Sequence, residues 1–168
     1  DFTQPTGHLA VFDLASRKAQ GTCPLFGQPD SIALDKGGRH AVIVMENERD
    51  EKFNKGAIPQ LPGGNLTIIP LSATGMPDCT RSHPVALNGL AEIAPDDAEP
   101  ELVKVNAQGI AVVTLQENNH IVLVDVAKRQ VIQHFSAGAV DLKEIDRTRN
   151  GIINPSESAK GLLREPDA

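Results

Sequence analysis

One phrase occurs three times along the chain, and it constrains the fold more than any other feature. The copies span residues 7–15, 64–72 and 119–127, offset by 57 residues from Gly7 to Gly64 and by 55 from Gly64 to Asn119. Each copy begins with Gly or Asn and continues as an apolar run. Self-similarity at a period near 50 is typical of propellers and repeat arrays, whose single units cannot bury their own faces.

A second phrase recurs out of step with the first. It begins with Pro and an acidic residue at positions 29–34 and 100–105, and a third copy opens at residues 165–168. The two phrases together define a four-strand unit in which the Pro-acid phrase forms the innermost strand. A propeller blade has this composition, with four strands arranged around a central channel.

Short runs rich in β-branched residues, separated by Gly, Pro, Asn and Asp, predict strands throughout. We expect strands at residues 9–14, 19–23, 31–34, 40–45, 66–71, 84–87, 102–105, 110–115, 121–126 and 131–135, and a short helix at 156–163. The runs 41–45 and 121–124 are apolar at every position, which predicts strands buried on both faces between stacked sheets.

The predicted class is therefore all-β, a β-propeller of which about two to three blades lie in this chain. The units are about 1–28, 29–99 and 100–138, followed by a loop insertion at 139–164 and the start of a next blade at 165–168. Too few strands are present to close a ring. The expected partner is the rest of the propeller, either as a second chain or as sequence not included here.

Composition narrows the function classes. Hydrophobic residues make up 40% and aromatic residues 3%, which predicts an aliphatic core. A net charge of −6 offers no basic footprint for nucleic acid, so we expect no nucleic-acid partner. No apolar stretch approaches the ~20 residues of a membrane span. Cys23 and Cys79 form either one disulfide or two buried thiols, and their spacing does not decide between these alternatives.

Two long segments interrupt the repeat, at residues 46–63 and 139–164, and in a propeller both would emerge on the same face. The first carries Glu46, Glu48 and Asp50, and Glu117 occupies the corresponding place after the strand at 110–115. Carboxylates converging on one face are ligands for Ca²⁺, which would in turn hold phosphate oxygens. The alternative is a charged loop that is merely solvated.

The second interruption contains a match to a calcium-binding loop at residues 146–157. Side-chain oxygens of Asp146, Thr148, Asn150 and Glu157 fall at positions 1, 3, 5 and 12, with Gly151 at position 6. The motif departs from the pattern because Thr148 replaces an acidic ligand and two Arg residues stand beside it. A solvated turn is the alternative.

The remaining residue patterns do not indicate a catalytic site. The five histidines are expected to be neutral packing residues. The chain has neither the Gly-x-Ser-x-Gly elbow of α/β-hydrolases nor a Gly-x-x-x-x-Gly-Lys phosphate loop. The sequence therefore assigns no catalytic residue.

Four segments, at residues 46–51, 56–65, 113–119 and 164–168, carry a family resemblance that spans nearly the whole chain. The chain resembles the N-terminal part of exported propeller proteins described as "esterase-like activity of phytase", and also the choice-of-anchor propellers found beside alkaline-phosphatase-like proteins. The resemblance implies a secreted or periplasmic propeller and phosphoester chemistry. Together with the acidic residues above, it leads to the hypothesis of calcium-assisted hydrolysis of a phosphate-ester ligand. The alternative is a non-catalytic propeller that binds calcium or a partner.

Overall fold

The computed structural model describes residues 3–50 and 52–167, and this part of the chain is almost entirely strand and loop. A hairpin is formed by β1 (Gly7–Asp13) and β2 (Lys18–Leu25). The first four-stranded sheet contains β3 (Pro29–Leu34), β4 (His40–Met45), β5 (Asn65–Pro70) and β6 (His83–Ala86). The second contains β7 (Pro100–Val105), β8 (Ile110–Leu115), β9 (His120–Asp125) and β10 (Gln130–Ser136). A second hairpin joins β11 (Ala139–Ile145) to β12 (Glu157–Leu163).

Neighbouring strands pair antiparallel in chain order within each sheet. The ten strands predicted from the sequence are all confirmed, with ends that differ by two residues at most. Two short 3-10 helices, Phe53–Gly56 and Cys79–Arg81, lie in the connections before β5 and β6. The all-β class is therefore correct, whereas a closed propeller is not seen in the described residues.

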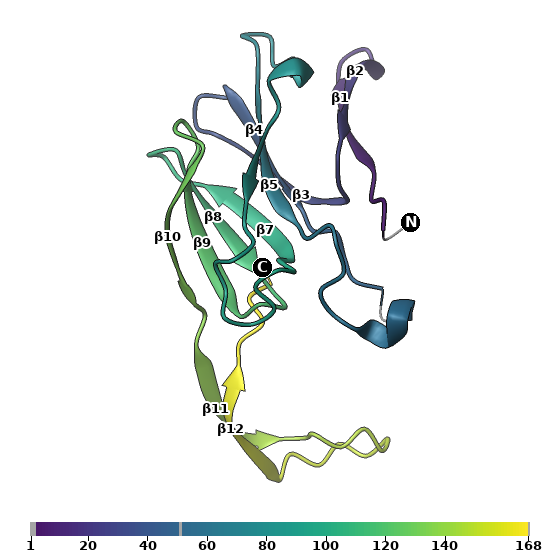
Figure 1. Ribbon diagram of the computed structural model, residues 1–168, viewed down its shortest axis with the longest axis vertical. Helices are drawn as coiled ribbons and strands as arrows, with labels where there is room; N and C mark the ends of the chain where they lie inside the picture. The colour runs from purple at the N-terminus through teal and green to yellow at the C-terminus, as the bar shows by residue number, and fades with distance from the viewer. Residues whose placement is uncertain (1–2, 51, 168) are drawn as a thin grey trace.

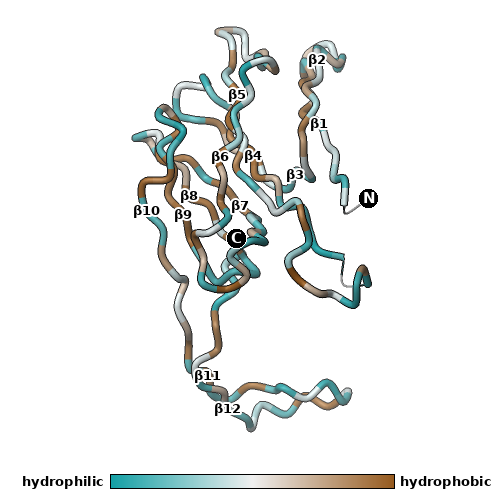
Figure 2. The backbone as a smooth tube through the Cα atoms, in the orientation of Figure 1, coloured by the Kyte–Doolittle hydropathy of each residue, from teal (hydrophilic) through white to brown (hydrophobic). Residues whose placement is uncertain are grey.

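The elements stack as three layers, with the β1–β2 hairpin on one face of the β3–β6 sheet and the β7–β10 sheet on the other (Figure 1). Hydrophobic residues concentrate on the strands of the two four-stranded sheets (Figure 2). The β11–β12 hairpin projects from this body as an arm. In the described part of the chain, no helix has the length and apolar character needed to cross a membrane.

The middle layer explains the continuous apolar run of β4. Val42 and Val44 face the β7–β10 sheet and join the larger core, while Ile43 and Met45 face the β1–β2 hairpin and join the smaller one. Successive side chains of a strand point to opposite faces, so both faces of this strand must be apolar. The prediction of two-sided burial at residues 41–45 is confirmed.

The same prediction is wrong for residues 121–124 in β9. Val122 and Val124 are fully buried, but Ile121 and Leu123 on the opposite face are only partly buried. The β7–β10 sheet is the last layer of the body, and its outer face is therefore left partly open to solvent.

A close contact between repeats accounts for the recurrence of Gly and Pro. A Cβ atom on Gly7 would lie 2.3 Å from Cδ of Pro29, and one on Gly64 would lie 2.3 Å from Cδ of Pro100. No side chain fits at such distances. Glycine at the start of one strand thus allows the proline that begins the next repeat to lie directly against it.

A disulfide joins Cys23 on β2 to Cys79 in the connection before β6, 56 positions along the chain. Its Cα atoms lie 5.3 Å apart, and Cys23 is fully buried in the smaller core. The alternative of two free thiols is thereby excluded. Stable disulfides belong to oxidising environments, which agrees with an exported protein.

The segment 139–164, expected as a loop with a helix at 156–163, is instead the β11–β12 hairpin. Gly161 adopts a φ of +63°, which a right-handed helix does not contain, and its amide donates to Oδ1 of Asp141 across the hairpin. The helix prediction is wrong because Gly161 fixes an irregular strand geometry at this point. The arm and the connection from β4 to β5 lie at the same end of the body (Figure 1), as the interruption pattern predicted.

Candidate functional site

The acidic residue that follows each repeated proline lies at the same end of the body. These residues are Asp30 at the start of β3, Glu101 in β7 and Asp167 in the third copy of the phrase. Partial burial and the charge of Asp167 raise the pKa of Asp30. Burial and the charges of Asp30 and Asp167 raise the pKa of Glu101. Since the charge of Asp167 acts on both Asp30 and Glu101, the three repeats bring their acidic residues into one electrostatic neighbourhood.

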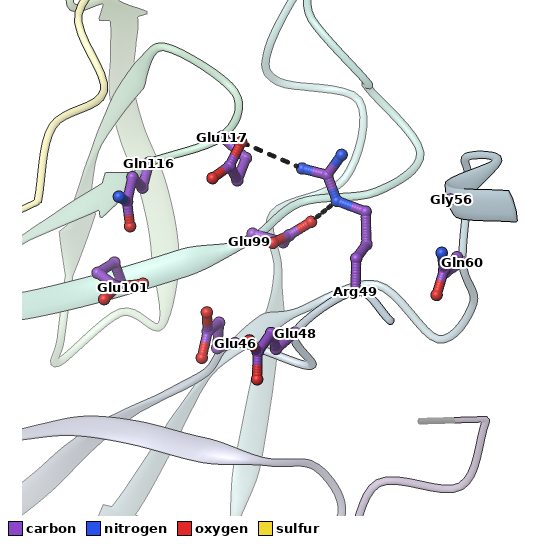
Figure 3. Close-up of a pocket in the computed structure, with 9 residues that line it drawn as sticks. All are labelled: Glu46, Glu48, Arg49, Gly56, Gln60, Glu99, Glu101, Gln116 and Glu117. Carbon is purple, nitrogen blue, oxygen red and sulfur yellow. Dashed lines mark hydrogen bonds and ion pairs between the residues drawn. The ribbon is translucent and has the colours of Figure 1, made fainter. Parts of the chain in front are cut away.

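Beside this neighbourhood is a pocket of about 430 Å³ between the ends of the two four-stranded sheets. Figure 3 shows its lining, which comes from the loop after β4, the approach to β7 and the turn after β8. The lining residues are Glu46, Glu48, Arg49, Gly56, Gln60, Glu99, Glu101, Gln116 and Glu117. Among these, five carboxylates face a single cationic side chain, so the pocket is strongly acidic.

Arg49 neutralises one side of the pocket. Its Nε donates to Oε1 of Glu99 and lies 3.8 Å from Oδ2 of Asp97, while its Nη2 lies 3.7 Å from Oε2 of Glu117. Asp97 and Glu99 are 1% and 4% exposed, so without this guanidinium two charges would be buried unpaired. Arg49 therefore serves first as the counter-charge of the pocket wall.

The opposite side of the pocket has no such compensation. Burial and the charges of Glu101, Asp30 and Glu48 raise the pKa of Glu46 to about 7. Glu48 accepts a hydrogen bond from an uncharged group, since Gln28 Nε2 donates to its Oε2 over 3.3 Å. This side can accept a proton or a cation, because either would relieve the repulsion between its carboxylates.

Two asparagines hold the loops that carry these side chains. Asn47 accepts a hydrogen bond from the amide of Gln28 over 2.8 Å, and Asn118 accepts one from the amide of Glu99 over 2.9 Å. Gln28 and Glu99 both immediately precede a repeated proline. The two asparagines thus occupy equivalent places and fix the same corner in successive repeats.

The predicted calcium ligands are distributed over several places. Glu46, Glu48 and Glu117 line the pocket, although Glu117 is paired with Arg49. Asp50 lies outside the lining, where its Oδ1 accepts a hydrogen bond from the amide of Lys52. The sequence did not single out Glu101, Glu99 or Arg49. The repeated Pro-acid phrase was the available signal for Glu101.

The predicted calcium loop lies far along the chain, between β11 and β12 of the arm. The two oxygens of Asp146 accept hydrogen bonds from the amides of Thr148 and Asn154. Asn150 accepts one from the amide of Ile152, and Glu157 accepts one from the hydroxyl of Thr148. These four side chains hold the turn of the hairpin together through contacts within the chain.

Within residues 3–50 and 52–167, no three His, Cys, Asp or Glu side chains are grouped in a way that could hold a metal ion as they stand. Ligation in the acidic pocket would require its carboxylates to rotate inward. Glu48 is exposed and Glu46 only partly buried, so both have room to do so.

Comparison with known proteins places the chain in a family. No curated protein matches it. The model of the choice-of-anchor I domain matches residues 1–168, which is the whole chain. The match supports the choice-of-anchor part of the resemblance noted in the sequence and does not support its phytase part. Choice-of-anchor domains are typically found in exported proteins of the cell surface. The chain belongs to the choice-of-anchor I domain family.

Proposed function

We propose that this chain is part of a β-propeller that serves an exported protein as a non-catalytic binding domain, with Ca²⁺ held in the acidic pocket. The observation that carries the proposal is the convergence of carboxylates from successive repeats on one uncompensated side of the pocket. Ca²⁺ takes 6–8 oxygen ligands, including several carboxylates, and binds extracellular modules with Kd of roughly 10⁻⁴–10⁻³ M.

The stacking of the sheets supports the propeller. The innermost strands β3 and β7 lie side by side, and each begins at the pocket end with a Pro-acid pair. The β1–β2 hairpin aligns by sequence with the outer strands β5–β6 and β9–β10, so it corresponds to the outer half of a further blade. Its partner would be two inner strands pairing with the free edge of β1, from a second chain or from the same polypeptide.

Calcium titration by calorimetry tests the binding function. We expect one Ca²⁺ per chain, and an affinity reduced at least about tenfold by Glu46→Gln or Glu101→Gln, because each substitution removes an anionic ligand. Glu144→Gln is the matched control, since Glu144 is exposed on β11 away from the pocket lining and should leave binding unchanged. Equal affinity in the wild type and both pocket variants would refute the site.

The same samples separate binding from the phosphoester hydrolysis that the phytase resemblance implied. We expect no turnover of an aryl phosphate in the presence of saturating Ca²⁺. Calcium-dependent turnover that disappears in Glu46→Gln would instead make the pocket an active site and overturn the non-catalytic assignment.

A further inference from the structure

Two histidines meet on β9 and on β10, the strand at the edge of the β7–β10 sheet. Neither of them lines the acidic pocket. In the β9–β10 pairing, His120 lies opposite Ser136, and His134 lies opposite Val122. Residues two apart on a strand share a face, so both imidazoles project from the same side. They line a cavity of about 330 Å³ together with Glu92 from the connection between β6 and β7.

The two rings contact each other directly. Nε2 of His120 lies 2.9 Å from Nδ1 of His134, and the ring centroids are 5.2 Å apart. His120 is 5% exposed, whereas His134 is exposed. One nitrogen of the pair donates and the other accepts, so a buried imidazole has a second imidazole as its hydrogen-bond partner.

The hydrogen bond between the rings requires a lone pair on one of the two contacting nitrogens, and a lone pair is what a metal ion binds. Neutral imidazole is a common ligand of divalent transition metals. When both rings are neutral, the one that carries its proton on the contacting nitrogen can move that proton to its other nitrogen, and both contacting nitrogens then offer a lone pair to one ion.

We propose that His120 Nε2 and His134 Nδ1 bind one divalent transition-metal ion, with the carboxylate of Glu92 as a third ligand. At metal–nitrogen distances of ~2.0–2.1 Å, two nitrogens 2.9 Å apart subtend an angle of about 90° at the metal. Right angles between nitrogen ligands suit tetragonal ions, which favours Cu²⁺ over tetrahedral Zn²⁺.

Glu92 completes the site by moving. It is exposed and lines the same cavity, and its charge acts on His120. As the side chains stand, the three groups are not close enough together to bind an ion. Rotation of this free carboxylate toward the imidazoles would provide the third ligand, and water would occupy the remaining positions.

Titration of the chain with Cu²⁺ in glycine buffer tests the site, because glycine suppresses weak binding to isolated side chains and to the amino terminus. We expect one bound ion whose electron paramagnetic resonance spectrum shows coupling to two imidazole nitrogens. Loss of a residue that only hydrogen-bonds to a metal ligand lowers metal affinity about 10–100-fold. His134→Gln removes a direct ligand, so it should weaken binding at least about tenfold. It should also leave one coupled imidazole.

His8→Gln is the matched control, since His8 is an exposed histidine on β1. It should bind Cu²⁺ as the wild type does. His134→Gln decides the test even if His120→Gln unfolds the chain, because His134 is exposed. Wild-type affinity in His134→Gln, an equal loss in His8→Gln, or no binding above that of glycine would each overturn the proposal. The test is independent of the Ca²⁺ proposal, because Glu46→Gln should leave Cu²⁺ binding intact.

Discussion

Glu46 is the residue on which the electrostatics of the acidic pocket converge. Its pKa is raised to about 7 by burial and by the charges of Glu101, Asp30 and Glu48. In the unfolded chain its pKa would return to about 4.5. Between these two values the folded protein holds a proton that the unfolded chain releases.

The free energy of unfolding should therefore fall as the pH rises from about 4.5 to 7, and the loss should persist above pH 7. Glu46→Gln should remove this decrease and stabilise the protein at pH 8. We expect an effect of no more than about 1 kcal/mol, because the carboxyl is partly solvated and its repulsion is screened. Urea unfolding across this pH range measures it, with Glu144→Gln as the control. Parallel pH profiles for the wild type and Glu46→Gln would contradict the prediction.

For single residues, the sequence predicted several of the acidic side chains that line the pocket, but it did not predict the arginine that neutralises one side of it. Glu46, Glu48 and Glu117 were identified as a loop cluster, but the pairing of Arg49 with Glu99 spans 50 positions. Such a contact depends on how two sheets stack, which no local pattern encodes. The His120–His134 contact was missed for a related reason, since it depends on the register of β9 and β10.

Among the elements, the corner held by Asn118 joins one repeat to the next. Its Nδ2 donates to the carbonyl oxygens of Ile93, Ala94 and Asp97, and its Oδ1 accepts from the amide of Glu99. Asn118 is 2% exposed, so these backbone groups have little access to water. One side chain thus satisfies four backbone groups of the connection between β6 and β7.

Asn118→Ala should lower the free energy of unfolding by about 2–4 kcal/mol, because it leaves several buried backbone groups without partners. Asn154→Ala is the control, since Asn154 is exposed and its change should stay within about 0.5 kcal/mol. Denaturant unfolding of both variants measures the difference. Equal stability of the two would show that water replaces the Asn118 side chain.

Strand prediction succeeded for the ten strands of the body and failed in the arm. The β11–β12 pairing shifts register twice, and Glu144 and Gly161 both adopt positive φ values. These irregularities break the two-residue period that identifies a strand. The ten predicted strands lack such repeated breaks, which is why residues 139–164 alone were misassigned.

For the whole molecule, the order of the layers predicts the order of local stability. The central strands β4 and β5 are covered on both faces, whereas the arm of β11 and β12 packs mainly against itself. Amides should exchange slowest where burial is two-sided and fastest where a hairpin stands alone. The β1–β2 hairpin, which covers one face of the middle sheet, should be intermediate.

Hydrogen exchange followed by mass spectrometry measures this order. We expect peptides of β4 and β5 to be protected longest and those of β11 and β12 to exchange first. Protection of the arm equal to that of the middle sheet would mean that the arm is covered by another molecule or another copy. The repeat period predicted the stacked sheets, but it did not show which face would be the last one, because the period is the same for every layer.

The contact of Gly7 with Pro29 and of Gly64 with Pro100 has a consequence for how such a chain can lengthen. The first two units each present a glycine to the proline that begins the next unit, whereas Asn119 stands at the equivalent place in the third unit. Duplication of the unit at residues 29–99, which carries both Pro29 and Gly64, would reproduce both halves of the joint at once, without compensating substitutions elsewhere. Since stacked repeats contact mainly their nearest neighbours, a gene encoding this joint can gain or lose such units while the remaining glycine–proline boundaries keep their fit.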